Sequence, residues 1–229
     1  MSEIERPLII EPEEKAGSSV IWLHGLGADA HDFEPIVPEL GGELRSSVRF
    51  VFPFAPHRPV TINGGMVMRA WYDIRDTDLS RRADEGGVRE SGEILSALVD
   101  AEIRNGITPD RIVLAGFSQG GAIALHAGLR YQRPIAGILA LSGYLPLHDA
   151  TRKEASEANR KVPIFMAHGS QDPIIPLSTS ESSRDFLTAL GYVVECHTYP
   201  MPHSVCAEEV RDIRDWLSRV LIWSRIPGA

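Results

Sequence analysis

Cysteine, long apolar runs and basic residues are all scarce in this sequence, and each shortage excludes a class of protein. Cys196 and Cys206 are the only cysteines among 229 residues, which excludes a disulfide scaffold and a four-cysteine zinc site. No run of 18 apolar residues occurs, so we expect no membrane-spanning helix. The 31 acidic residues outnumber the 23 basic ones, and the net charge of −8 argues against nucleic acid as a partner, because phosphate binding requires clustered basic residues.

Targeting and cofactor motifs are missing as well. Residues 1–7 lack the basic and apolar regions of a signal peptide, which predicts a cytoplasmic protein without stable membrane insertion. The metal-binding patterns H-x-x-x-H and C-x-x-C and the glycine-rich nucleotide motifs are absent, so neither a metal nor an organic cofactor is expected. The 43% hydrophobic content is enough for a large core, and the length favours a single domain over residues 1–229.

Short β-branched runs alternate with helical patterns along nearly the whole chain. Strands are expected at 8–11, 19–24, 48–52, 111–117, 135–141, 162–167 and 192–199, and helices at about 29–40, 88–105, 118–130, 177–190 and 207–223. This alternation predicts an α/β fold, with a mostly parallel central sheet and helices on both faces. The segment 57–87 is rich in glycine, proline and arginine, and we expect a long functional loop there.

A G-x-S-x-G pentapeptide, from Gly116 to Gly120, carries the strongest chemical signal. It lies between an expected buried strand and an expected helix, which is where a nucleophile elbow occurs. The turn is so tight that a side chain at either glycine would collide with the neighbouring strand or helix. Ser118 would then point out at the carboxyl end of the sheet, beside a helix N-terminus that favours developing negative charge. The context favours Ser118 as a nucleophile over an incidental serine in a glycine-rich turn.

A general base should follow Ser118 in the chain, because in this kind of site the order is serine, acid, histidine. His203 follows the last expected strand, at the carboxyl edge of the sheet, where a base can reach Ser118. His126 lies within a helix, His148 in a polar surface stretch and His197 within a strand, so these three are less suitable. The sequence therefore favours His203 as the base.

Asp172 is the expected acid of the same site. It follows the apolar strand at 162–167, and a proline fixes its loop, so its carboxylate can hold the imidazole of His203 in one tautomer. Asp149 lies in a polar stretch and Glu195 within a strand. The alternative is that Asp172 only forms a turn before proline.

Two backbone N–H groups are expected to stabilise an oxyanion. One belongs to Gln119, directly after the nucleophile, and the other to a loop that follows an early strand. Leu26 fits the second role, because it lies between glycines that let the backbone approach a substrate. His24 precedes this loop and is interpreted as a structural hydrogen-bonding residue.

Apolar side chains near these positions are candidates for a substrate groove. Trp71 and Met66 lie in the long segment, Ile174 and Ile175 follow Asp172, and Leu145 follows an expected strand. Ordinary packing of loops onto the core is an equally good interpretation of these residues.

Taken together, these motifs resemble the small lidless carboxylesterases of the α/β-hydrolase superfamily, close to acyl-protein thioesterases and lysophospholipases. The resemblance spans almost the whole chain and rests on residues 20–27, 55–65, 70–74, 116–121 and 168–173 and on the loop before His203. Two of these stretches, Arg-Pro-Val-Thr-Ile-Asn-Gly-Gly and Trp-Tyr-Asp, look more like the bacterial carboxylesterase branch. Pro202 stands beside His203, where the family pattern has glycine.

The resemblance implies Ser118, Asp172 and His203 as a catalytic triad and Leu26 and Gln119 as oxyanion donors. It also implies that there is no metal or organic cofactor, and that a homodimer is possible. We therefore expect a serine carboxylesterase that hydrolyses small-molecule esters with short- to medium-chain acyl groups, because no length remains for a cap domain. An acyl-protein thioesterase or lysophospholipase is the alternative within hydrolases. A non-catalytic binding protein that retains the fold is the alternative of a different class.

Overall fold

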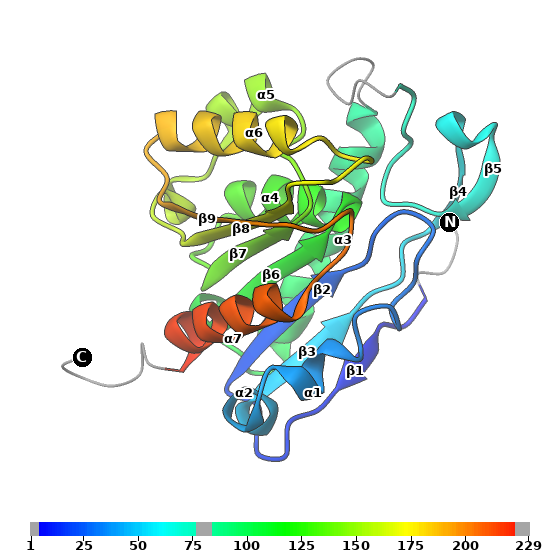
Figure 1. Cartoon of the computed structure of the whole chain (residues 1–229). Helices are drawn as coiled ribbons and strands as arrows, with labels where there is room; N and C mark the ends of the chain where they lie inside the picture. The colour runs from blue at the N-terminus through cyan, green and yellow to red at the C-terminus, as the bar shows by residue number, and fades with distance from the viewer. Residues whose placement is uncertain (1–4, 77–83, 223–229) are drawn as a thin grey trace.

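One central sheet organises the molecule (Figure 1). The computed structural model describes residues 5–76 and 84–222, and within these residues seven strands pair in the order β1-β3-β2-β6-β7-β8-β9. Every neighbouring pair is parallel except β1 with β3. The strands of this sheet are β1 (Leu8–Ile10), β2 (Ser18–Leu23), β3 (Val48–Phe52), β6 (Ile112–Phe117), β7 (Gly137–Leu141), β8 (Ile164–Gly169) and β9 (Val194–Tyr199).

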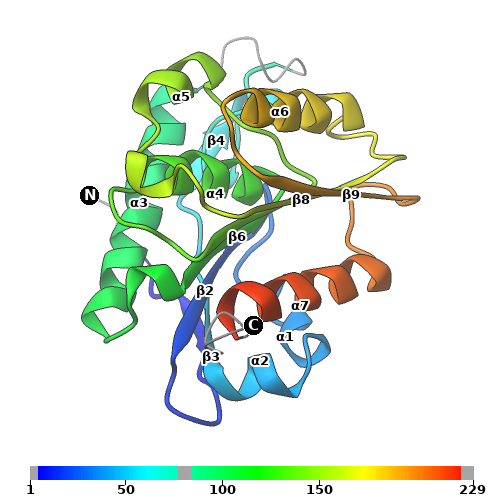
Figure 2. The same ribbon diagram turned by 90° about the vertical axis from the view of Figure 1, so that its left-hand side faces the viewer.

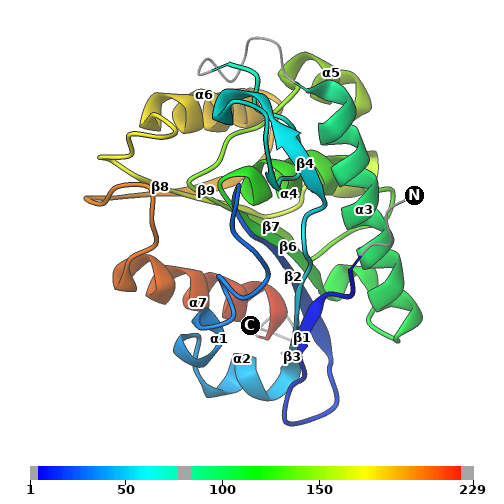
Figure 3. The ribbon, with the colours of Figure 1, turned by 90° about the vertical axis from the view of Figure 1, so that its right-hand side faces the viewer.

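Helices cover both faces of the sheet, as Figures 2 and 3 show from opposite sides. One face carries α3 (Glu85–Arg104), α4 (Gln119–Arg130), α5 (His148–Glu154) and α6 (Leu177–Ala189), and the other carries α1 (Ile36–Glu39), α2 (Gly42–Ser47) and α7 (Ala207–Leu221). Short 3-10 turns occur at η1 (Thr61–Asn63), η2 (Pro109–Arg111) and η3 (Glu157–Asn159). The expected mostly parallel α/β architecture is confirmed. Within the described ranges, no helix is both long and apolar enough to span a membrane.

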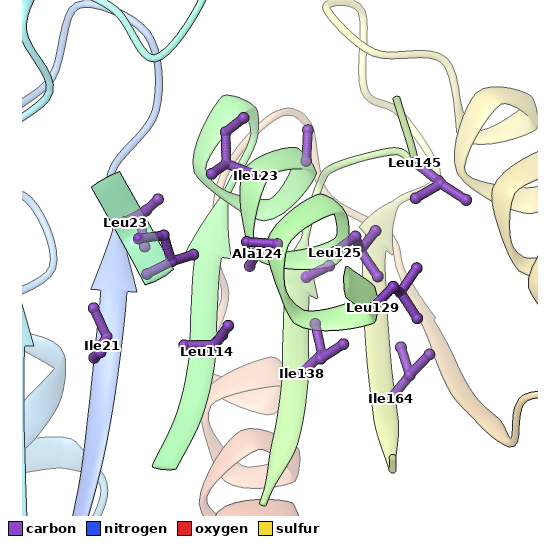
Figure 4. Close-up of a cluster of buried hydrophobic side chains, with 14 of the residues drawn as sticks. Ile21, Leu23, Leu114, Ile123, Ala124, Leu125, Leu129, Ile138, Leu145 and Ile164 are labelled. Carbon is purple, nitrogen blue, oxygen red and sulfur yellow. The ribbon is translucent and has the colours of Figure 1, made fainter. Parts of the chain in front are cut away.

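Strands β2, β6, β7 and β8 are apolar on both sides because each contributes to two cores. Their residues alternate between the core under α3, α4 and α6 and the core under α1, α2 and α7, as expected for side chains that point to opposite faces in turn. In β2, Ile21 and Leu23 belong to the first core, and Val20 and Trp22 to the second. Figure 4 shows part of the first core, where Leu114, Ile138 and Ile164 of three strands meet the apolar side of α4.

The prediction of one helix over about residues 29–40 is wrong in its length. The structure has turns up to Pro35, the four-residue helix α1 and then α2. Pro35 and Pro38 have no N–H to donate, so a helix that started near residue 29 would lose two of its backbone hydrogen bonds. Gly41, with φ +88°, precedes α2 instead of ending a long helix.

The segment 57–87 is not a loop without secondary structure. β4 (His57–Val60) and β5 (Met66–Arg69) form an antiparallel hairpin that lies apart from the main sheet in Figure 1. Thr61 donates from its backbone N–H and its hydroxyl to the carboxylate of Asp73, both at 2.7 Å, which ties the hairpin to the chain that follows it. Residues 77–83 of this segment lie outside the described residues, as does Trp223 at the end of the last expected helix.

Candidate active site

Ser118 lies in a strained turn between β6 and α4. Its backbone has φ +56° and ψ −119°, which is a sparsely populated conformation for a residue with a side chain. A Cβ atom at Gly116 would lie 2.2 Å from the carbonyl carbon of Gly120, and one at Gly120 would lie 2.3 Å from the carbonyl oxygen of Leu23. Both glycines are therefore needed for steric reasons, and this geometry is that of a nucleophile elbow.

Asp172 is held rigidly in the loop after β8. Its Oδ1 accepts hydrogen bonds from the backbone N–H groups of Ile174 at 2.8 Å and Ile175 at 2.9 Å. Its Oδ2 lies 2.6 Å from Nδ1 of His203, and the carboxylate side chain is completely buried. Because both oxygens have fixed partners, Asp172 can orient the His203 ring with its proton on Nδ1.

The loop that carries His203 is bonded directly to the loop that carries Asp172. The N–H of Ser170 donates to the carbonyl of Tyr199 at 2.8 Å, and the N–H of Gln171 donates to the carbonyl of Met201 at 3.1 Å. The His203 ring packs on the ring of Phe117, with 4.7 Å between centroids. Since Phe117 immediately precedes Ser118, this contact holds the imidazole beside the elbow, and both Ser118 and His203 line one cavity.

The buried His168 contacts Asp172 and has a structural role. Its Nε2 donates to the carbonyl of Ile175 at 2.8 Å and lies 3.3 Å from Oδ2 of Asp172. Burial lowers the pKa of this imidazole, so it stays neutral and supports the Asp172 loop.

Leu26 lies in a loop that approaches the elbow closely. A Cβ atom at the preceding residue, Gly25, would lie 3.4 Å from Cβ of Ser118, which is ordinary contact. His24 fixes the start of this loop, because its Nδ1 donates to the carbonyl of Gly25 at 2.7 Å while its Nε2 accepts from the N–H of Ala55 at 3.1 Å. Burial lowers the pKa of His24, and a neutral ring is what these two bonds require, which agrees with the structural role inferred from the sequence.

The side chain of Gln119 has a function that sequence reasoning missed. Its Oε1 accepts from the N–H of Trp71 at 3.0 Å, and its Nε2 donates to the carbonyl of Tyr72 at 2.8 Å. Gln119 therefore fastens the chain after the β4–β5 hairpin to the start of α4. The candidate oxyanion donor is the backbone N–H of the same residue, so the two functions are separate.

The elbow opens into a cavity of about 610 Å³. Ser118, His203, Leu26 and Gln119 all line it, so the structure brings the expected nucleophile, base and oxyanion loop to one place. Among the described residues, the rest of the wall is formed by Gly25, Ala28, Asp32, Ile62, Asn63, Tyr72, Ile74, Asp76, Phe117, Tyr144, Pro173, Ile174, Ile175 and Pro176. Two of the five expected substrate residues, Ile174 and Ile175, are therefore on the wall.

The other three expected substrate residues are outside this lining, which corrects the sequence interpretation. Trp71 is completely buried, and its Nε1 donates to the carbonyl of His24 at 2.8 Å. Leu145 is buried in the core under α4 and α6 (Figure 4). Met66 is 64% exposed on β5. The aromatic residues on the wall are Tyr72, next to the expected Trp71, and Tyr144, next to the expected Leu145, besides Phe117 and His203 at the elbow.

Comparison with known proteins gives one consistent family. The family model described as Phospholipase/Carboxylesterase matches residues 4–221. Acyl-protein thioesterase 1 of Neurospora crassa is 41% identical over 224 residues, which cover 94% of this chain and 91% of that protein. Acyl-protein thioesterase 1 of Cryptococcus neoformans is 37% identical, over 93% of this chain and 97% of that protein. These relatives are fungal, whereas two sequence motifs look more like the bacterial branch.

Solved structures agree with the family match. The crystal structure of Arabidopsis thaliana SOBER1 has a TM-score of 0.85 at 33% identity, over 90% of this chain and 99% of that chain. Zea mays acyl-protein thioesterase 2 has a TM-score of 0.80 at 26% identity, over 94% of this chain and 99% of that chain.

Proposed function

Starting from the fact that the chain belongs to the phospholipase/carboxylesterase family and has the α/β-hydrolase fold, we propose that it hydrolyses carboxylic esters through an acyl-enzyme on Ser118. The observation that carries this proposal is the strained Ser118 elbow in one cavity with His203, whose Nδ1 lies 2.6 Å from the buried Asp172 carboxylate. A nucleophile, a base and an acid that orients the base are the parts that acyl transfer requires.

In the proposed reaction, the hydroxyl oxygen of Ser118 attacks the acyl carbonyl carbon while Nε2 of His203 takes the hydroxyl proton. Asp172 keeps the proton of the neutral ring on Nδ1 and stabilises the imidazolium that forms. The backbone N–H groups of Leu26 and Gln119 donate to the oxyanion. His203 then protonates the leaving group, and afterwards it activates a water molecule that attacks the acyl-enzyme and restores Ser118.

The preferred substrates in this proposal are uncharged esters with short- to medium-chain acyl groups. The cavity wall includes the side chains of Ile62, Ile74, Ile174 and Ile175. Apolar walls favour the alkyl part of an uncharged ester.

Thioesters of acylated proteins are the second candidate substrate class. The curated relatives at 37–41% identity are named acyl-protein thioesterases, and a thioester carbonyl needs the same nucleophile and oxyanion donors. A series of p-nitrophenyl esters from acetate to palmitate, measured beside one palmitoyl-thioester peptide, separates the two. Highest kcat/KM for butyrate to octanoate supports the first candidate, and highest kcat/KM for the palmitoyl thioester supports the second.

Labelling with a fluorophosphonate probe tests the proposal itself. We expect the wild type to be labelled and Ser118→Ala to be unlabelled, with both proteins showing the same circular dichroism spectrum. Labelling that persists in Ser118→Ala would place the nucleophile elsewhere. A folded wild type that neither labels nor hydrolyses any ester would favour a non-catalytic binding protein.

A further inference from the structure

Two tyrosines on the wall of the active-site cavity are hydrogen-bonded to each other through their hydroxyl groups. The hydroxyl oxygens of Tyr72 and Tyr144 lie 2.8 Å apart, and both side chains are on the cavity wall with Ser118. Tyr72 leads from the β4–β5 hairpin and Tyr144 follows β7, so two distant parts of the chain bring the pair together. Both residues are more than nine-tenths buried.

The hydrogen bond between Tyr72 and Tyr144 uses one hydroxyl proton and leaves the second without an acceptor among the described residues. Each tyrosine hydroxyl donates one hydrogen bond, and the bond between the two uses only one of the two protons. Within the part of the chain that the structure describes, neither hydroxyl has a further protein partner. Burial raises the pKa of Tyr144 to about 12 and the pKa of Tyr72 well above its usual range, so both protons stay in place at neutral pH. The second O–H is therefore available to whatever occupies the cavity.

The tyrosine pair and the phenylalanine ring that contacts the base pack on opposite faces of the sheet. Tyr72 and Tyr144 pack in the core under α3, α4 and α6. Phe117, whose ring contacts the ring of His203, packs against the core under α1, α2 and α7. Since His203 must protonate the leaving group in the proposed reaction, the leaving group lies on its side. The acyl chain then extends toward the tyrosine pair.

Resting on the proposed esterase function, we propose that the Tyr72–Tyr144 hydroxyl pair determines acyl specificity. The pair donates one hydrogen bond to the acyl group and so favours acyl chains that carry an oxygen acceptor over plain alkyl chains of equal length. The physical reason is that an alkyl chain leaves a buried donor without a partner, whereas an ether, hydroxyl or carbonyl oxygen satisfies it. The aliphatic residues of the same wall are compatible with the methylene groups on either side of such an oxygen.

Matched p-nitrophenyl esters test this proposal. Butyrate is paired with methoxyacetate, and pentanoate with 3-methoxypropanoate, so that within each pair an oxygen replaces one methylene group. The kcat/KM ratio of ether to alkyl ester is measured for wild type, for each single Tyr→Phe variant and for the double variant Tyr72→Phe/Tyr144→Phe. Intrinsic differences in ester reactivity cancel when this ratio is compared between proteins.

We expect the double variant to lower the ratio by about three- to tenfold for at least one pair, which is the effect of losing one neutral hydrogen bond. Each single variant keeps one of the two hydroxyls. The variant whose ratio falls less is the one that still has the hydroxyl in contact with the substrate. Tyr131→Phe is the matched control, because its hydroxyl donates to Asp100 at 2.6 Å and is not on the wall of this cavity. It should leave the ratio unchanged.

An unchanged ratio in a folded double variant would overturn the proposal. If both esters lose activity equally while the ratio stays unchanged, the pair acts on the carbonyl common to both. These outcomes are distinct from failure of the esterase proposal, in which the wild type itself would neither be labelled by the phosphonate nor hydrolyse butyrate.

Discussion

Replacing Asp172 by asparagine tests the proposed roles of the acid and the base at once. The amide has one oxygen and one NH₂ group, and the structure decides where each goes. The Oδ1 position accepts two backbone N–H groups, from Ile174 and Ile175, so the amide oxygen must occupy it. The NH₂ group then faces Nδ1 of His203, where the carboxylate oxygen lies at 2.6 Å in the wild type.

This arrangement reverses the tautomer of His203. Nδ1 must accept a hydrogen bond from the NH₂ group, so the ring proton moves to Nε2, which can no longer take a proton from Ser118. The equivalent tautomer reversal in a serine protease lowers kcat about 10⁴-fold, which corresponds to about 5.5 kcal/mol of transition-state stabilisation. We expect a loss of this order here, with little change in stability, because the shape and the two backbone hydrogen bonds are kept.

The assay is steady-state hydrolysis of p-nitrophenyl butyrate, with thermal unfolding measured on the same preparations. Asp149→Asn is the matched control, since Asp149 is an exposed residue of α5 and is one of the two alternative acids, with Glu195, that the sequence offers. The control should keep wild-type kcat. The reasoning is refuted if Asp172→Asn retains more than a tenth of wild-type kcat, or if Asp149→Asn loses as much activity.

Three further predictions concern the elbow and the last helix. Gln119→Ala leaves two buried backbone groups of residues 71–72 unpaired, so we expect a loss of about 1–3 kcal/mol in the free energy of urea unfolding, while phosphonate labelling of the folded fraction persists because the backbone N–H remains. Gly120→Ala forces a methyl group to within 2.3 Å of the Leu23 carbonyl oxygen, so we expect little soluble protein and no labelling; an active, stable variant would contradict the elbow geometry. Burial raises the pKa of Glu209 to about 8, so the folded state holds a proton that the unfolded state releases above about pH 4.5, and stability falls as the pH rises from there to 8. Glu209→Gln should remove that fall and be about 2–4 kcal/mol more stable than wild type at pH 8.5, measured by urea unfolding at pH 5, 7 and 8.5, and equal slopes for both proteins would disprove the assignment.

Features that depend on short-range chemistry were predictable from the sequence. The strands and the elbow follow from apolar runs and from glycines at fixed spacing around Ser118, because both patterns act within a few residues. His203 and Asp172 were found from chain order, and the structure brings them to 2.6 Å. The helix expected at about 29–40 is shorter in the structure, because a glycine end signal at Gly41 and Gly42 does not outweigh the N–H groups that Pro35 and Pro38 lack.

The sequence by itself thus determined the parallel α/β architecture and the candidate groups Ser118, Asp172 and His203. Only the tertiary structure decided the walls of the cavity. Trp71 and Tyr72 are neighbours in the chain, yet the first is sealed in the core and the second reaches the cavity, where it meets Tyr144. Periodicity cannot distinguish such neighbours in an irregular segment, because their directions are set by long-range hydrogen bonds such as those from the Gln119 side chain. The specificity proposed here for the tyrosine pair therefore depends on contacts between segments about 70 residues apart, which no local pattern encodes.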